Sequence, residues 1–170
     1  GQNRIVFPAG ILQPPFFDAK ASDASNYGGI GMVIGHEIIH HFDDRGRQFD
    51  DVGRNRNWWT KETDARFLAK ANELIDQYDS YCPYQDVCVN GLGTLGENIG
   101  DLAGLEIAYA AWKLSLNGKP PAVLNGLTGD QRFFLSWAQV WKAVAREDTA
   151  RRLLTLDPHS PPAYRVDRKS

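Results

Sequence analysis

The sequence predicts a mainly α-helical fold with a small β component. Apolar residues recur three or four positions apart in its long segments, as they do on the buried face of an α-helix. Gly and Pro residues follow these segments, which is how helices commonly end. Strands are expected only within the first twenty residues and around residues 47–50 and 87–95. A chain of 170 residues fits one domain, which can bury a real core without help from a metal or disulfide.

The composition disfavours two classes of function. Hydrophobic residues make up 42% of the chain and charged residues 24%, as in ordinary soluble globular proteins. A formal net charge of −2 with scattered basic residues argues against a nucleic-acid partner. The longest apolar stretch, residues 5–12, is too short to span a membrane, so we expect no membrane contact by this segment itself. The chain opens without Met or a signal-peptide pattern, and we expect it to be part of a longer protein.

The first expected helix carries the most informative motif. Residues 1–18 are apolar and contain three prolines, which predicts an extended entry segment. Ser22 and Ser25 are suitable N-cap residues, so a helix is expected over residues 25–42. Each of its glycines costs roughly 0.8–1.0 kcal/mol of helix propensity relative to Ala. Close packing against a neighbouring element is the expected reason that they are there.

Three more helices are expected after a charged, Gly-containing loop at residues 43–54. Their expected ranges run from near Thr60 to before Pro83, from 95 to 116, and from 130 to 147. The last of them carries several aromatic residues at helical spacing, which is typical of a core-facing helix.

Residues 36–40 read His-Glu-Ile-Ile-His, the H-E-x-x-H pattern of zinc hydrolases. Residues four apart lie about 40° from each other around a helix, so His36 and His40 can reach one metal ion from one face. Glu37 flanks that ion, where a carboxylate is suited to act as a general base on zinc-bound water. The motif therefore predicts a zinc-dependent hydrolase with two histidine ligands.

Glu97 is the candidate for the third ligand. A catalytic zinc ion usually has three protein ligands and keeps its fourth position for water. Glu97 and Asp101 are four residues apart, hence on one face of an otherwise apolar expected helix. Alone, Glu97 reads more simply as a solvated residue of a first helical turn, stabilised by the helix dipole. Beside an H-E-x-x-H helix it reads as a ligand, with Asp101 accepting the second N–H of a metal-bound imidazole.

The chain has two histidines outside the H-E-x-x-H motif. His41 points about 100° away from His40 on the helix, which makes it a poor ligand for the same ion. We expect it to pack or to face solvent. His159 lies in a proline-rich loop with Arg165 six residues later. A lone loop histidine is commonly exposed, but an imidazole and a guanidinium can also stabilise the oxyanion of peptide hydrolysis, and Asp157 can orient His159.

The two cysteines, Cys82 and Cys88, lie close together in a proline-containing loop. They are compatible with a local disulfide in an oxidising compartment and equally with two free thiols. Their spacing matches no common zinc pattern.

Several motifs together resemble the catalytic domain of neprilysin-type zinc metalloendopeptidases, the family that includes endothelin-converting enzyme. The similarity extends over nearly the whole chain. The segments that carry it are residues 3–17, 33–44, 58–60, 94–101, 131–137 and 157–161. The resemblance implies a thermolysin-like (gluzincin) catalytic domain, in which the H-E-x-x-H helix packs against the helix of the E-x-x-x-D motif at residues 97–101. This sequence departs from the family pattern at His41, where Gly is usual, and at Gly100, where Ala or a similar small residue is usual.

Roles for individual residues follow from this resemblance. His36, His40 and Glu97 match the ligands of one Zn²⁺ per chain, and Glu37 matches the catalytic base. Asp101 matches an acid that assists from behind the metal. His159 and Arg165 match groups that bind the transition state and the substrate backbone. The substrates implied are peptides, with a large apolar residue favoured after the cleaved bond.

The family also implies a context for residues 1–170. They correspond to a part of the catalytic domain that lacks the helical lid domain, the preceding substrate-binding segment and the extreme C-terminus. An extracytoplasmic location is implied, whether periplasmic, secreted or in a membrane-anchored ectodomain. The alternative function is a non-catalytic fragment in which zinc is structural and the surface serves binding. Structural zinc sites usually have four protein ligands, whereas this chain offers three and a base.

Overall fold

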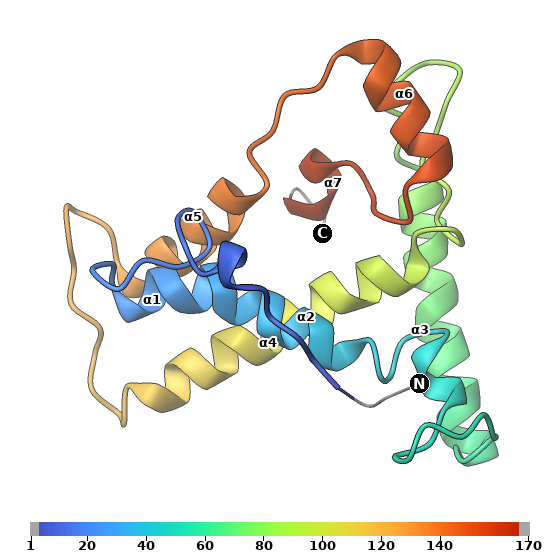
Figure 1. Cartoon of the computed structure of the whole chain (residues 1–170), viewed down its shortest axis with the longest axis horizontal. Helices are drawn as coiled ribbons and strands as arrows, with labels where there is room; N and C mark the ends of the chain where they lie inside the picture. The colour runs from blue at the N-terminus through green and yellow to red at the C-terminus, as the bar shows by residue number, and fades with distance from the viewer. Residues whose placement is uncertain (1–3, 167–170) are drawn as a thin grey trace.

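The computed structural model describes residues 4–166, which fold into helices joined by loops (Figure 1). Over these residues the β-structure is limited to three isolated bridges, Phe49–Asn55, Tyr84–Val87 and Leu124–Leu127. The mainly helical class is therefore confirmed, but the strands expected in the first twenty residues are wrong for the described part. Residues 4–8 are extended without a neighbouring strand to pair with, and a short 3₁₀ helix, η1 (Ala9–Ile11), follows them. In the described chain, no helix combines the length and hydropathy required to cross a bilayer.

The helix expected at residues 25–42 is a rod of three joined elements. It consists of α1 (Asp23–Asn26), the π-helical η2 (Tyr27–Gly31) and α2 (Met32–Ile39). Ser22 caps it, because its hydroxyl accepts the backbone N–H of Ser25 at 3.3 Å. The rod begins two residues before the expected start and ends three residues before the expected end, with His40 as its C-cap.

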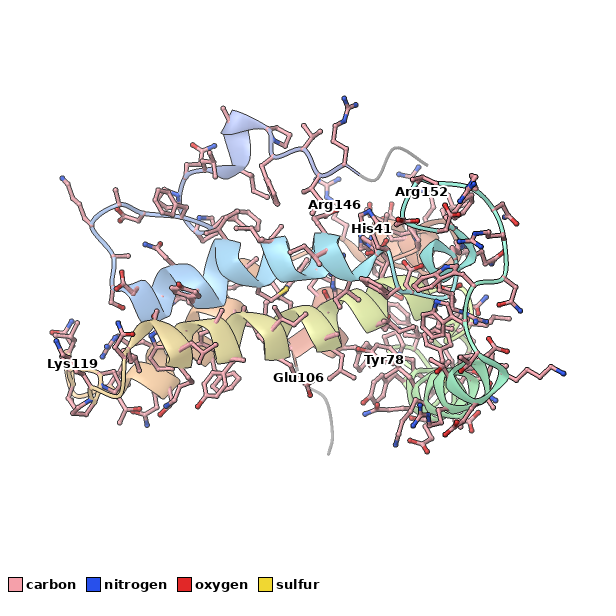
Figure 2. The ribbon with its side chains drawn as sticks, turned by 90° about the horizontal axis from the view of Figure 1, so that it is seen from below. His41, Tyr78, Glu106, Lys119, Arg146 and Arg152 are labelled. Atoms are coloured by element: carbon pink, nitrogen blue, oxygen red, sulfur yellow. A yellow bond between two sulfur atoms is a disulfide. The ribbon has the colours of Figure 1, made fainter. Side chains whose placement is uncertain are left out.

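Helix α4 (Leu95–Ser115) lies alongside this rod, as Figure 2 shows. The two backbones touch where Gly35 of α2 faces Gly104 of α4. A Cβ atom on Gly35 would lie 2.6 Å from the carbonyl oxygen of Gly104, which is too close for any side chain. The expected reason for the glycines is confirmed at this point: the absence of a side chain lets α2 approach α4 closely enough for His36 to reach it.

Two hydrophobic clusters hold the elements together, and both include residues of α4. One joins α1, α2 and α4 to α5 (Gly129–Val140), through Ala24, Met32, Ala108, Trp112, Phe133 and Trp137. The other joins the start of α4 to α3 (Lys61–Asp79) and the loop after it, through Ala71, Leu74, Tyr78, Tyr81, Val89 and Leu95. Helix α4 therefore connects the two clusters, and the H-E-x-x-H residues lie beside its first half.

The later part of the chain differs from the expectation. Helices α3 and α4 follow their expected ranges closely, and Thr60 is the N-cap of α3. Helix α5 ends at Val140 instead of 147, and an extended segment precedes α6 (Glu147–Leu156). A short α7 (Pro162–Val166) stands where a loop was expected. Its proline is at the first helical position, where the fixed φ angle and the missing N–H are compatible with a helix.

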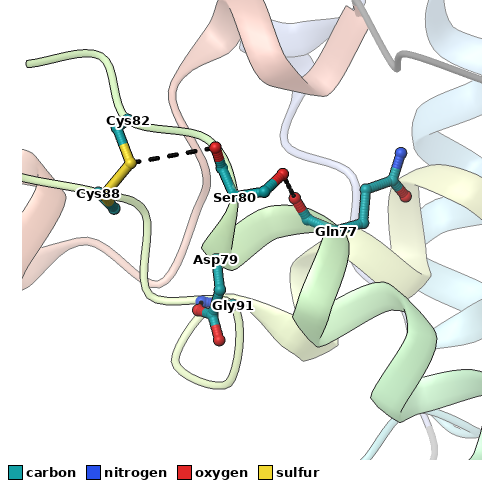
Figure 3. The surroundings of a disulfide bond; sticks show 6 residues. All are labelled: Gln77, Asp79, Ser80, Cys82, Cys88 and Gly91. Atoms are coloured by element: carbon teal, nitrogen blue, oxygen red, sulfur yellow. Dashed lines mark hydrogen bonds between the residues drawn. A yellow bond between two sulfur atoms is a disulfide. The ribbon is translucent and has the colours of Figure 1, made fainter.

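Of the two alternatives for the cysteines, the structure has the disulfide. Cys82 and Cys88 are joined in the loop that follows α3 (Figure 3). The same loop is anchored by the Asp79 carboxylate, which accepts the backbone N–H of Gly91 at 2.6 Å. The loop leads directly into α4 and so helps to fix where that helix begins.

Replacing Gly35 with Ala tests the contact between α2 and α4. Ala favours a helix by about 1 kcal/mol over Gly, but here its Cβ meets backbone atoms that cannot rotate away. We expect a net loss of about 1–3 kcal/mol in the free energy of unfolding, measured with urea. Gly31→Ala is the matched control, since its Cβ would be 3.5 Å from its nearest neighbours. Equal stability of the two variants would contradict this account of the contact.

Candidate metal centre and active site

Helix α2 supplies two histidines that face the same point. His36 is buried in the last turn of α2, and His40 follows at its C-cap, half-buried. Their ring centroids are 4.6 Å apart and the ring planes are nearly perpendicular, at 89°. The i, i+4 spacing thus brings the two imidazoles together as the motif predicted.

Glu97 of α4 completes the convergence. Its Oε2 atom is 3.1 Å from Nε2 of His36 and 3.6 Å from Nε2 of His40. The same oxygen is 3.0 Å from Nε2 of His159, which comes from the loop before α7. Three imidazole nitrogens from two distant parts of the chain therefore surround one carboxylate oxygen.

The donor set fits zinc. Two imidazole nitrogens and one carboxylate oxygen are ligands that zinc prefers. Ligand atoms about 2.0–2.1 Å from a tetrahedral zinc ion lie about 3.3–3.4 Å from each other, and the separations of 3.1 and 3.6 Å bracket that value. Glu37 offers a competing carboxylate, because its oxygen and the nitrogens of His36 and His40 lie within 4.8 Å of one another. Glu97 is our candidate ligand, since its oxygen lies 3.1 and 3.6 Å from the two nitrogens, close to the separation that a tetrahedral zinc ion requires.

Asp101 orients His36 from behind. Its Oδ1 atom is 3.0 Å from Nδ1 of His36, so the imidazole can donate this N–H and keep Nε2 free for a metal. Arg165 donates to both oxygens of Asp101, at 2.6 and 2.7 Å. Asp101, fully buried, is thus paired with a guanidinium that is itself 5% exposed and lies over the ring of Trp141. These contacts support a role for Arg165 in holding Asp101, and its contact with substrate stays a prediction.

Asp43 orients His40 in the same way, and the sequence analysis missed it. Its Oδ2 atom is 2.7 Å from Nδ1 of His40, and its Oδ1 atom accepts the backbone N–H groups of Arg45 and Gly46. One carboxylate therefore holds the imidazole and the turn that ends the helix. The signal was present in the sequence: an acid three residues after a histidine lies one helical turn away.

His159 is held from its own loop. Oδ1 of Asp157 accepts the backbone N–H of His159 at 2.9 Å and lies 2.7 Å from its Nδ1 atom. The structure therefore brings Asp157 to His159 in the way the sequence suggested. The His159 side chain remains 42% exposed, so it is the candidate group most open to a bound molecule. By contrast, His41 is half-buried beside a cavity of ≈ 780 Å³ that Phe42 and Trp58 also line.

Hydrogen bonds and ion pairs among these histidines and carboxylates shift their pKa values. Burial alone would lower the pKa of His36, but hydrogen bonds to Asp101 and Glu97 outweigh it and raise that pKa to about 9. Burial alone would raise the pKa of Glu97, yet His159 and His36 hold it well below its ordinary value. Hydrogen bonds to Glu97 and Asp157 raise the pKa of His159, although burial opposes them. The cluster therefore keeps its carboxylates ionised, and His36 has to release its Nε2 proton when a metal ion binds.

A match to one known family covers residues 1–169 of the chain, and that family is peptidase family M13. The chain belongs to peptidase family M13. Its resemblance to the neprilysin type is thereby confirmed.

Two curated relatives and one solved structure illustrate the similarity within the M13 family. Neprilysin-1 of Caenorhabditis elegans is 48% identical over 172 residues, which cover 98% of this chain and 23% of that protein. Endothelin-converting enzyme 1 of Bos taurus is 45% identical over 168 residues, 97% of this chain and 22% of that protein. The inhibitor complex of the zinc metalloprotease Zmp1 of Mycobacterium tuberculosis superposes with a TM-score of 0.95 and 53% identity, over 98% of this chain and 26% of that one. This chain thus spans about a quarter of the length of these M13 relatives.

Replacing Glu97 with Ala tests the candidate third ligand. The variant keeps both histidines but loses the oxygen on which they converge. We expect zinc to be lost on dialysis while the helical circular dichroism is retained, with metal content measured by atomic emission. Glu106→Ala is the matched control, because Glu106 is an exposed acid on the same helix (Figure 2). A Glu97→Ala variant that retains stoichiometric zinc would exclude Glu97 as a ligand.

The pKa shifts predict how the stability of the zinc-free protein depends on pH. The pKa of His36 is raised to about 9, so its contribution is complete below its unfolded value near 6.5 and is lost as the pH rises through 9. The pKa of Asp101 is lowered by Arg165 and His36 despite burial, so its contribution is present above about pH 4 and lost on acidification. Urea unfolding after chelation should show highest stability between about pH 4.5 and 6.5. Stability that increases from pH 7 to 9 would contradict these assignments.

Proposed function

We propose that this chain carries the catalytic centre of a zinc-dependent endopeptidase that hydrolyses small peptides. The observation that supports it most directly is the convergence of Nε2 of His36 and Nε2 of His40 on Oε2 of Glu97. In this proposal these three residues hold one Zn²⁺ per chain. The helix pairing of α2 with α4, together with the M13 relatives, supports a gluzincin type of site.

Glu37 is the proposed general base. When bound, zinc supplies Lewis acidity, which polarises a peptide carbonyl and lowers the pKa of water toward about 7. Glu37 lies next to His36 on α2 and is half-buried, so its carboxylate borders the candidate ligands. It takes a proton from the attacking water and delivers one to the leaving amine, which balances the cleavage of the peptide bond.

His159 is the proposed donor to the oxyanion. With Nδ1–H directed at Asp157, a protonated His159 has its Nε2–H directed at the point where the candidate ligands converge. An oxyanion that forms beside Oε2 of Glu97 can accept that hydrogen bond in place of Glu97 as its charge develops. Arg165 supports the same step indirectly, because it neutralises Asp101 and thereby keeps His36 in place. Its direct contact with the substrate backbone is part of the proposal.

The remaining features of the function follow from the M13 family. Because this chain spans about a quarter of its relatives, we propose that residues 1–170 are a portion of the catalytic domain of a larger enzyme. Peptides are the proposed substrates, and an extracytoplasmic compartment the proposed location. The disulfide between Cys82 and Cys88 is compatible with such a compartment.

Replacing Glu37 with Gln separates catalysis from metal binding. The amide keeps the shape of the side chain but cannot take a proton, so we expect zinc to stay bound and hydrolysis to fall by at least about a hundredfold. The measurements are zinc content and the cleavage of a quenched fluorescent peptide, with a chelator to identify metal-dependent activity. Glu106→Gln, an exposed acid on α4, is the control.

Three outcomes distinguish the proposal from its alternative. Chelator-sensitive cleavage that disappears in Glu37→Gln supports the peptidase. Full activity in Glu37→Gln excludes Glu37 as the base. Stoichiometric zinc without cleavage by the unmodified protein favours the alternative, in which zinc is structural and the surface serves binding.

A further inference from the structure

Three contacts fasten the C-terminal segment to the first turns of α4. Glu97 meets His159, Asn98 meets Ser160, and Asp101 meets Arg165. The contacts appear in the same order along both segments, so together they set the register of residues 157–166 on the helix. The first and third involve charged residues of the candidate active site. The contact between Asn98 and Ser160 involves neither charge nor a candidate ligand.

The Asn98–Ser160 contact is a buried hydrogen bond with a fixed direction. The Ser160 hydroxyl donates to Oδ1 of Asn98 at 2.8 Å, and the two residues are 2% and 1% exposed. The amide group of Asn98 cannot rotate freely, because its Nδ2 atom donates to the hydroxyl of Thr94 at 2.9 Å. The hydroxyl of Thr94 in turn donates to the backbone carbonyl of Asn90 at 2.9 Å. Ser160 is therefore tied through a short chain of bonds to the backbone that begins α4.

The hydrogen bond between Ser160 and Asn98 also restrains the neighbouring contact between His159 and Glu97. Asn98 directly follows Glu97, Ser160 directly follows His159, and consecutive Cα atoms are 3.8 Å apart. Holding Asn98 against Ser160 thus limits how far Glu97 and His159 can separate. Asp157 cannot do this, because it belongs to the same loop as His159 and moves with it. Arg165 anchors the segment six residues further on, which keeps the chain attached without fixing the imidazole.

We propose that Asn98 and Ser160 are positioning residues that hold His159 against Glu97. The inference rests on the proposed function for its catalytic consequence, because His159 acts there on the developing oxyanion. Losing the hydrogen bond leaves the zinc ligands intact but allows the imidazole to move relative to them. A displacement of about 1 Å is enough to slow a reaction by up to about a hundredfold. Neither Asn98 nor Ser160 touches the reacting atoms in this scheme.

Three variants separate positioning from stability. Ser160→Ala leaves the buried Oδ1 of Asn98 without its donor, which destabilises the protein. Asn98→Leu removes the acceptor. The double variant Asn98→Leu/Ser160→Ala replaces the pair with apolar groups, which restores much of the stability because no buried polar atom is left unpaired. Thr94 keeps its bond to the carbonyl of Asn90 in every case.

The expected result is a separation of two readouts. In the zinc-loaded protein, the double variant should recover most of the melting temperature that Ser160→Ala loses. Its kcat should remain reduced by about tenfold or more, with little change in KM. Ser115→Ala is the control, since its hydroxyl donates to the carbonyl of Trp112, near the far end of the same helix. If kcat recovers together with the melting temperature, the pair is merely structural and the proposal is wrong.

A second measurement does not depend on catalysis. Hydrogen exchange of the backbone amides of Asp157, His159 and Ser160 should become faster in the double variant, with zinc content unchanged. Unchanged exchange there would overturn the proposal. If the unmodified protein cleaves no peptide, the proposed function fails, and the exchange measurement alone decides whether Asn98 and Ser160 hold the loop.

Discussion

The candidate site depends on a contact between two backbones. Gly35 and Gly104 let α2 and α4 approach so closely that any side chain at either position would collide with the other helix. That approach brings the histidines of one helix to the carboxylates of the other. The glycines lower the helix propensity of both elements, and in return they permit the short distance between α2 and α4. Local preference is therefore overruled by the geometry of the site.

Each histidine of the cluster has its own acid. Asp101 holds His36, Asp43 holds His40, and Asp157 holds His159, each through Nδ1. The pattern fixes which nitrogen carries the hydrogen and leaves the Nε2 atoms facing Glu97. A further charge balances the most buried of these acids, because Arg165 pairs with Asp101. The site is thus a layered arrangement, in which a charge outside the cluster supports the carboxylates, and the carboxylates support the rings.

The parts of the site that could be predicted are those specified by residues close together in the sequence. The pairs His36/His40 and Glu97/Asp101 follow from helical spacing alone, and the rule that a catalytic zinc needs a third ligand led to Glu97. The contact of Asp101 with Arg165 joins residues 64 positions apart, and no local pattern specifies it. Helix α7 was missed because the proline-rich segment that contains His159 was read as a loop throughout, whereas Pro162 stands at a helix start. The strands expected in the first twenty residues do not form. A strand needs a second segment to pair with, and residues 4–8 have no such partner among the described residues.

Helix α4 takes part in both hydrophobic clusters, and this has a consequence for how the protein assembles. Within the hydrophobic clusters, its first half packs with α3, and its second half packs with α1, α5 and Met32 of α2. The candidate ligands come from both sides of this division, His36 and His40 from one and Glu97 from the other. The chain must close a loop of about sixty residues before they meet, so the site is complete only when these distant segments have packed together. Under the proposed function, the metal ion binds only when both halves have docked, because its proposed ligands come from both.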